Sequence, residues 1–299
     1  MRYLLRKAVI NPVPEVEISA QDFSGLKAAR VVLSNAFAIE EKYEIVISNF
    51  LDLEKQLLEV AATNAVRKTN TYAEFFDTRS VLNIRLVNLL TATRLYLDQL
   101  PQHISECGLK DTGASALVKS RCSAEYDKYF EFRFMEALRN YVQHRGIPVH
   151  FVSQGARWTS FEDDGLMEFS VHIAAQLSHL EEDGKFKKSV LKEISKDVDL
   201  IAAARRYLES ISAINEFVRE LLSEPATSAR AAIESAHHRY SQVYTESLIG
   251  LSALEMEESR VISSVSLLLE WDDVRIQLQK RNQQLVNLSK RYVTSRVSI

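Results

Sequence analysis

The chain is poor in the two residues that end helices and form tight turns. Its 299 residues include only 8 glycines and 5 prolines. Sandwiches, barrels and propellers need such residues at many turns, so this scarcity argues against these architectures and favours long helices. An apolar fraction of 46% is ordinary for a globular protein and is enough for one sizeable core.

Apolar residues recur at spacings of three and four along most of the chain, which is the pattern of an amphipathic helix. The first such stretch starts near Ser24 and fades at Thr63–Asn64. Pro101 is expected to close the second helix, and Gly146 with Pro148 forms the usual stop after the third. In full, the spacing predicts helices at about 24–64, 71–101, 119–145, 186–223, 226–258 and 262–294.

Two stretches instead alternate between apolar and polar residues, as strands do. They run over 149–153 and 167–173, with the polar Glu162–Gly165 between them, so a β-hairpin is predicted there. A further strand is expected within Arg2–Ile10, before Pro12 and Pro14 interrupt regular structure.

Together these patterns predict a mostly α fold, a bundle of long antiparallel helices with a small β-hairpin insertion. We expect an extended N-terminal segment at 1–25, a helical domain at 26–146, the hairpin and its connections at 147–185, and a C-terminal helical region at 186–299. A single fused bundle is equally consistent with the sequence.

Charge, cysteines and hydropathy limit the partners. Lysine and arginine number 37 against 40 aspartates and glutamates, so the net charge is −3. Any contact with RNA or DNA must therefore be local, or weak until chemistry occurs. Cys107 and Cys122 are the only cysteines, and both are expected to be reduced and at least half buried. The first residues carry charges within their apolar stretch and are not expected to be a signal peptide, and no run reaches the roughly 18 apolar residues of a membrane span. The sequence therefore predicts a soluble, cytoplasmic protein with no membrane partner.

One group of residues carries chemistry. Arg139 and His144 have four residues between them and lie at the end of the third predicted helix. Asn140 and His144 share a helix face, whereas Arg139 is turned by about 140° from His144, so the pair would flank a groove. The helix dipole favours the imidazolium form of His144, which can then take and give a proton near neutral pH. Arg145 and His150 have the same spacing, but the glycine and proline between them exclude a helix there.

A base and a cation, without metal ligands, are sufficient to cleave RNA with its own 2′-hydroxyl as the nucleophile. In this hypothesis His144 moves the proton and Arg139 stabilises the charge that develops on the phosphate oxygens. Asn140 orients one of these groups or the substrate. DNA lacks the 2′-hydroxyl and would not be cut.

The segment Arg139-Asn-Tyr-Val-Gln-His144 resembles the R-x4-6-H motif of the HEPN superfamily, in which a polar residue, often Asn, follows the Arg. The resemblance implies a helical-bundle domain over about 26–146 that forms a homodimer, with two motifs facing each other in a composite site. It also implies a metal-independent endoribonuclease that leaves 2′,3′-cyclic phosphate ends and needs no cofactor. Relatives act in toxin–antitoxin and antiviral defence systems, so an antitoxin or defence partner protein is expected. Only Arg139, Asn140 and His144 are carried over as catalytic residues.

Simpler interpretations stay open. Arg139 and His144 can serve as a helix C-cap in a non-catalytic helical scaffold that binds partner proteins. The pair His237–His238 and the spaced His172 and His179 are better explained as structural or surface residues than as metal ligands. The acidic pairs, among them Asp272–Asp273, are typical of solvated loops and helix starts.

Overall fold

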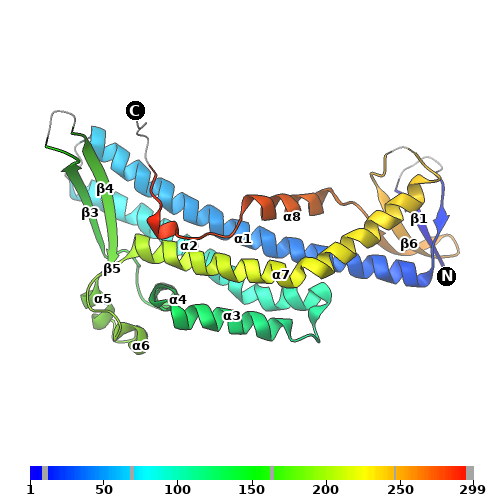
Figure 1. The fold of residues 1–299 in the computed structure, drawn as a ribbon, viewed down its shortest axis with the longest axis horizontal. Helices are drawn as coiled ribbons and strands as arrows, with labels where there is room; N and C mark the ends of the chain where they lie inside the picture. Colours follow the sequence, from blue (N-terminus) through cyan, green and yellow to red (C-terminus); the bar gives the residue numbers. More distant parts are fainter. Residues whose placement is uncertain (9–12, 68–70, 162–164, 246, 294–299) are drawn as a thin grey trace. The chain divides into compact units, whose positions relative to one another are not determined.

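The computed structural model describes residues 1–8, 13–67, 71–161, 165–245 and 247–293. Most of these residues are helical, and two small antiparallel sheets complete the fold (Figure 1). The prediction of a mostly α chain is therefore confirmed. By their contacts the residues form two compact units. Unit 1 comprises Met1–Lys42, Asp98–Lys119 and Glu216–Gln283, and unit 2 comprises Tyr43–Leu97, Ser120–Asn215 and Gln284–Ile299.

The helices differ greatly in length. They are α1 (Ala20–Val66), α2 (Tyr72–Ile104), α3 (Ala114–Lys128), α4 (Phe130–His144), α5 (Leu177–Glu182), α6 (Lys188–Leu191), α7 (Leu200–Ser241) and α8 (Glu270–Arg281). The strands are β1 (Arg2–Lys7), β2 (Val16–Glu17), β3 (Phe151–Trp158), β4 (Met167–Ala175), β5 (Val198–Asp199), β6 (Leu251–Glu257) and β7 (Arg260–Ser266).

Unit 2 is built around parts of α1, α2, α4 and α7. The rings of Tyr43 on α1 and Tyr96 on α2 lie 5.9 Å apart, and the Tyr96 hydroxyl donates to Asn215 Oδ1 at 2.9 Å. Phe132 on α4 packs against Tyr207 on α7 with ring centroids 5.2 Å apart. These contacts place aromatic rings from all four helices in one core.

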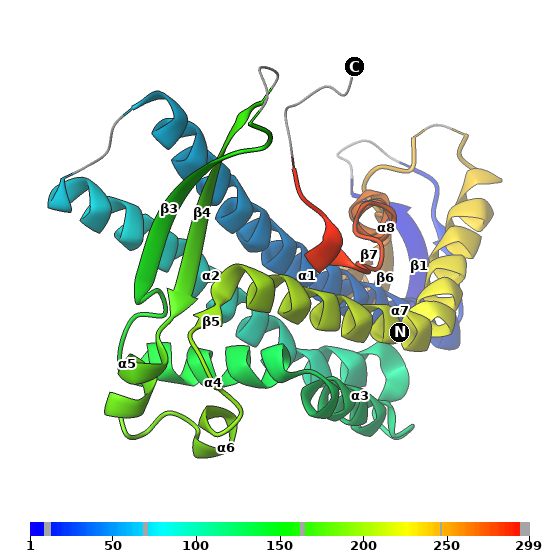
Figure 2. The ribbon, with the colours of Figure 1, turned by 60° about the vertical axis from the view of Figure 1, so that its left-hand side comes forward.

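A three-stranded antiparallel sheet, in the order β3-β4-β5, belongs to the same unit (Figure 2). Strands β3 and β4 form the predicted hairpin, with Val152 opposite Ile173 and Trp158 opposite Met167. Val152 and Ile173 are buried at the base of the hairpin, while Trp158 and Met167 are exposed. The predicted turn residues 162–164 lie outside the described part of the chain.

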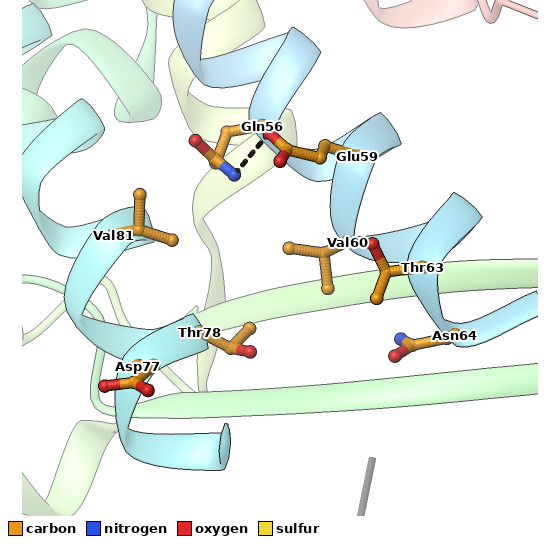
Figure 3. A pocket seen from close by; sticks show the side chains of 8 residues that line it. All are labelled: Gln56, Glu59, Val60, Thr63, Asn64, Asp77, Thr78 and Val81. Atoms are coloured by element: carbon orange, nitrogen blue, oxygen red, sulfur yellow. Dashed lines mark hydrogen bonds between the residues drawn. The ribbon is translucent and has the colours of Figure 1, made fainter. Parts of the chain in front are cut away.

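A pocket of about 300 Å³ lies between the end of α1 and the start of α2 (Figure 3). Two carboxylates, Glu59 and Asp77, contribute to its wall, but both residues are exposed. Glu59 also accepts a hydrogen bond from Gln56 Nε2 at 3.0 Å. The remaining lining residues are Val60, Thr63, Asn64, Thr78 and Val81. Its described lining residues include neither histidine nor arginine, the groups of the sequence-predicted chemistry.

Unit 1 contains a four-stranded antiparallel sheet in the order β2-β1-β6-β7. Strand β1 pairs with β6, so that Leu4 lies opposite Leu254 and Leu5 opposite Ala253. Leu5 and Ala253 belong to a core with residues of α1 and α7, whereas Leu4 and Leu254 form a separate buried cluster with Met256. Both faces of β1 and β6 are therefore covered by apolar side chains.

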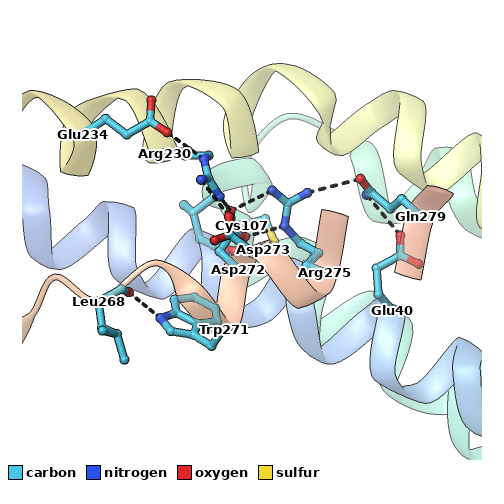
Figure 4. A network of polar contacts seen from close by, with 11 residues as sticks. Glu40, Cys107, Arg230, Glu234, Leu268, Trp271, Asp272, Asp273, Arg275 and Gln279 are labelled. Carbon is cyan, nitrogen blue, oxygen red and sulfur yellow. Dashed lines mark hydrogen bonds and ion pairs between the residues drawn. The ribbon is translucent and has the colours of Figure 1, made fainter. Parts of the chain in front are cut away.

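Ion pairs attach α8 to α7, and a hydrogen bond attaches it to α1, within unit 1 (Figure 4). Asp272 is fully buried and accepts hydrogen bonds from Arg230 at 2.8 Å and from Arg275 at 2.5 and 3.1 Å. Asp273 accepts a further bond from Arg230 at 2.8 Å, and Gln279 donates to Glu40 on α1 at 3.1 Å. The two guanidinium partners offset the free-energy cost of removing the Asp272 carboxylate from water.

Several helix boundaries differ from the sequence-based prediction. α1 begins at Ala20, inside the predicted extended segment 1–25, because Ser19 and Asp22 form a reciprocal cap: each backbone N–H donates to the other side chain at 3.0 Å. The end of the predicted N-terminal strand at Ile10 lies outside the described residues.

The predicted helix at 119–145 is two helices. The break is at Tyr129, whose φ of −118° and ψ of 122° are extended. Arg133 Nη1 donates to the carbonyls of Tyr126 and Asp127 at 2.7 and 2.8 Å, and thus satisfies the end of α3. Glu193 holds the same guanidinium through Nε and Nη2.

Two helix boundaries predicted at prolines were wrong: the end of the second helix at Pro101 and the break at Pro225 between the predicted helices 186–223 and 226–258. Pro101 lies inside α2 and Pro225 lies inside α7, which continues to Ser241. On α7 the neighbours Leu222 and Ala226 are buried, and their packing outweighs the hydrogen bond that proline removes.

The C-terminal region 186–299 was predicted to be helical, but residues 251–257 and 260–266 form β6 and β7. The sequence of β6 is rich in Leu, Ala, Met and Glu, which are good helix formers. Pairing with β1 and burial on both faces override this local preference, since Leu251, Ala253, Leu254 and Met256 are all buried.

Candidate active site at the end of α4

α4 owes its position to one apolar face. Its buried residues are Phe132, Phe134, Met135, Ala137 and Leu138. The helix ends at His144, and the backbone N–H groups of Arg145 and Gly146 both donate to the carbonyl of Tyr141, at 2.8 and 3.3 Å. The predicted stop at Gly146 is thus confirmed.

The segment after the helix is fixed to α2. Asn83 Oδ1 accepts the backbone N–H of Val149 at 2.8 Å, and both Asn83 and Val149 are buried. Gly146 lies under the Tyr141 ring, where a Cβ atom would come within 2.5 Å of the Tyr141 hydroxyl. A larger residue at position 146 would therefore displace the ring. These contacts hold the last turn of α4 in place.

His150 completes this docking and is structural. Its Nδ1 accepts the backbone N–H of Gln176 at 3.0 Å, its Nε2 lies 3.4 Å from the Tyr141 hydroxyl, and its ring stacks on His179 with centroids 4.9 Å apart. Burial, followed by the neighbouring His179, lowers the pKa of His150 to about 4. His150 is therefore neutral at physiological pH.

The three predicted site residues lie in the last two turns of α4. Asn140 and His144 are exposed, and Arg139 is partly buried. Arg139 Nη1 donates to Asn140 Oδ1 at 2.6 Å and to Gln143 Oε1 at 2.9 Å. The structure thus brings Arg139 and Asn140 into direct contact. Within the described residues, the His144 imidazole makes no hydrogen bond or ion pair.

These contacts do not match a helix cap. A capping Arg or His donates to the last carbonyls of the helix. Arg139 donates to side-chain amides instead, and the terminal carbonyl of Tyr141 is taken by backbone N–H groups. Neither Arg139 nor His144 is needed to satisfy the end of α4.

Three neighbours were missed by sequence reasoning. Tyr207 on α7 donates a hydrogen bond to Glu136, and Arg94 on α2 forms an ion pair with the same carboxylate at 3.6 Å. Burial and the Glu136 carboxylate raise the pKa of Tyr207 well above its usual value, and Arg139 is close enough to oppose this shift slightly. The site is therefore bordered by α2, α4 and α7.

No sequence signal identifies these neighbours. Tyr207 occupies an ordinary buried position in the apolar pattern of α7, 71 residues from its partner Glu136. Gln143, by contrast, lies four residues after Arg139 and could have been recognised from helical spacing.

Other candidate groups take structural roles. His172 lies 3.6 Å from Asp199, and His179 stacks on His150. Over the described ranges, no group of three or more His, Cys, Asp or Glu side chains could hold a metal ion. Burial raises the pKa of Cys107 to about 12 and of Cys122 to about 11, so neither thiol forms a reactive thiolate at neutral pH.

In comparisons with known proteins, no family model, no curated protein and no solved structure matches the chain. Among the helices that the structure describes, none combines the length and the apolar character needed to cross a membrane.

Proposed function

We propose that this chain is a metal-independent endoribonuclease of the HEPN type, a bundle of antiparallel helices that cleaves RNA through the RNA's own 2′-hydroxyl. His144 transfers the proton, Arg139 binds the reacting phosphate, and Asn140 orients Arg139. One observation carries the proposal: the last two turns of α4 hold both an exposed imidazole, without a hydrogen bond or ion pair among the described residues, and a guanidinium that takes no part in capping the helix.

The reaction needs a base, an acid and a cation. Neutral His144 accepts the proton of the 2′-hydroxyl, whose oxygen attacks the adjacent phosphorus. The bond from phosphorus to the 5′-oxygen breaks as that oxygen takes a proton from an imidazolium. Arg139 stabilises the additional negative charge on the phosphate oxygens. The products are a 2′,3′-cyclic phosphate and a 5′-hydroxyl.

Among the described residues at the end of α4, one imidazole, that of His144, is suited to proton transfer. His150 is six residues away, but both of its ring nitrogens have partners and its pKa is too low for proton transfer at neutral pH. We therefore infer a homodimer with a composite site, in which His144 of a second copy provides the acid. The rate per chain is expected to fall when the protein is diluted below the dissociation constant of the dimer.

The biological role that we propose is that of a toxin or antiviral defence effector in the cytoplasm. An enzyme that cuts RNA in its own cell must be restrained, so an antitoxin or another defence-system protein is the expected partner. This role rests on the resemblance of Arg139–His144 to the HEPN motif.

The test is RNA cleavage in excess EDTA. The wild-type protein should produce fragments with 2′,3′-cyclic phosphate ends, and should leave DNA of the same sequence intact. His144→Asn should lower the rate by a factor of about 10² to 10⁴. Its thermal stability should stay at the wild-type value, because the His144 side chain is exposed.

The matched control is His238→Asn, which changes an exposed histidine on α7 and should leave cleavage unchanged. Full activity in His144→Asn, or no cleavage of any RNA by the wild-type protein, would contradict the proposal. Loss of stability in His144→Asn without any cleavage by the wild type would instead support the scaffold interpretation.

A further inference from the structure

Among the described contacts, Arg139 is held through one nitrogen, Nη1. Nη1 carries two hydrogens, and these are donated to two neutral acceptors, Asn140 Oδ1 and Gln143 Oε1. Gln143 lies one helical turn after Arg139, so its amide reaches back along the same side of α4. Among the described residues, Nε and Nη2 of Arg139 have no hydrogen-bond or ion-pair partner.

Several other arginines of the chain use the edge that Arg139 leaves open, Nε and Nη2, to bind a carboxylate. In unit 2, Arg205 uses Nε and Nη2 to bind Glu54 at 2.6 and 2.8 Å. Arg133 binds Glu193 through the same two nitrogens, at 3.2 and 2.6 Å. In unit 1, Arg219 binds Glu40 with the same edge at 2.8 and 2.7 Å. In each of these three arginines, a carboxylate accepts the hydrogen bonds of the Nε–Nη2 edge.

The nearest carboxylate on α4 does not fill this role for Arg139. Glu136 lies three residues earlier, but its oxygens are engaged by Tyr207 and Arg94. The Nε–Nη2 edge of a guanidinium matches two oxygens of one anion, either a carboxylate or a phosphate. The amide partners of Arg139, Asn140 and Gln143, are uncharged. They therefore fix its guanidinium without neutralising it or repelling an anion.

We propose that Gln143 is a positioning residue of the RNA site: together with Asn140 it holds Nη1, so that the open Nε–Nη2 edge of Arg139 binds one phosphodiester of an RNA strand. This inference rests on the proposed function for the identity of the anion. It adds to that function a residue that acts through Arg139 and the orientation in which Arg139 meets the substrate.

The test measures binding separately from cleavage. The probe is a short single-stranded RNA with 2′-O-methyl groups, which cannot supply the attacking hydroxyl. Gln143→Glu provides a carboxylate that binds Arg139 and competes with phosphate, so affinity should fall about tenfold or more. Gln143→Met has a similar length but no acceptor, and it should weaken binding less than Gln143→Glu does.

Stability distinguishes positioning from a structural role. In Gln143→Glu the new ion pair with Arg139 should keep thermal stability at or above the wild-type value while RNA binding falls. A structural role would lower both together. Gln102→Glu adds the same charge at an exposed position on α2 and should change affinity by less than about twofold.

The outcomes separate this inference from the proposed function. If Gln143→Glu and Gln143→Met bind the probe as the wild type does, or if the wild type does not bind it, the role of Gln143 is refuted. A different combination would refute the proposed nuclease activity but support the phosphate site. In that case the wild type binds the probe, both variants lose this binding, and no protein cleaves unmodified RNA.

Discussion

At the scale of single residues, His144 and His150 show how differently one side-chain type can be used. They are six positions apart, but His144 is exposed and has no hydrogen bond or ion pair among the described residues, whereas His150 is partly buried and contacts Tyr141, Gln176 and His179. A proton carrier needs access to solvent and substrate. His144 is exposed to solvent, as its proposed role requires, whereas His150 acts as a neutral packing group.

His150 predicts a pH dependence of stability. Its pKa is about 4 in the folded chain and about 6.5 when unfolded. Above pH 6.5 both states are neutral and its contribution is complete. As the pH falls towards 4, the unfolded chain takes up a proton that the folded chain does not, so stability is lost. After allowance for partial exposure, the loss is about 1–3 kcal/mol.

The measurement is thermal unfolding of the wild type and of His150→Asn between pH 7 and 4.5. Asn keeps an acceptor for the Gln176 N–H but does not titrate, so the variant should lose less stability over this range. Parallel curves for the two proteins would mean that His150 is not responsible.

At the same scale, the sequence was sufficient for some parts of the site and not for others. Arg139, Asn140 and His144 are close in sequence, and helical periodicity alone places them in adjacent turns. The acceptors that bind Arg139 depend on side-chain rotamers, and the donors that bind Glu136 come from other helices, as the hydrogen bond from Tyr207 to Glu136 shows. Such long-range contacts leave no periodic pattern in the sequence.

At the scale of secondary-structure elements, the end of α4 depends on its docking to α2. Asn83 and Asn49 provide a matched pair. Each donates from Nδ2 to the carbonyl four residues earlier, Asn83 at 2.9 Å and Asn49 at 2.8 Å. Only Asn83 also accepts a buried backbone N–H, that of Val149.

Asn83→Ala should therefore lower the free energy of unfolding by about 1–3 kcal/mol more than Asn49→Ala, because it leaves the Val149 N–H unsatisfied in the interior. Urea denaturation of both variants measures the difference. It should be accompanied by faster hydrogen exchange at Val149. Equal losses in the two variants would show that the Val149 contact does not anchor this segment.

The attachment of α8 gives a second matched pair. Asp272 is buried between Arg230 and Arg275, whereas the side chain of Asp273 is 48% exposed and bonds only Arg230 among the contacts described. Asp272→Asn leaves two guanidinium groups without their shared buried charge and should cost about 3–5 kcal/mol. Asp273→Asn should cost about 1 kcal/mol or less. Differential scanning calorimetry tests the order, and a larger effect at Asp273 would refute it.

Elements were predictable where local pattern and tertiary packing agree. The β3–β4 hairpin follows from alternation that matches its burial, since Val152 and Ile173 pair and are buried. β6 was missed because its helix-forming residues are held in a strand by β1, whose partner residues are about 250 positions away. A proline marks a helix end only when packing on its far side is weak, and on α7 Ala226 and Ala229 continue the buried face.

At the scale of the whole molecule, the net charge limits how the proposed RNA substrate can be bound. The net charge is −3, and several arginines are already paired with carboxylates, including Arg205, Arg219 and Arg230. The chain has no excess of positive charge to attract a polyanion, so we expect affinity for RNA to come from a small number of contacts. Specific contacts at the site then matter more than general attraction to the polyanion.

Salt dependence tests this conclusion. Each phosphate neutralised on a single strand contributes about −0.7 to the slope of log affinity against log salt. With one or two such contacts, a tenfold rise in salt should weaken binding of the 2′-O-methyl RNA about 5- to 25-fold. Arg139→Met should reduce the slope by about 0.7, whereas Arg67→Met, at an exposed position, should leave it unchanged. A slope steeper than about −3 would require a broad basic surface, which the near balance of 37 basic and 40 acidic residues does not provide.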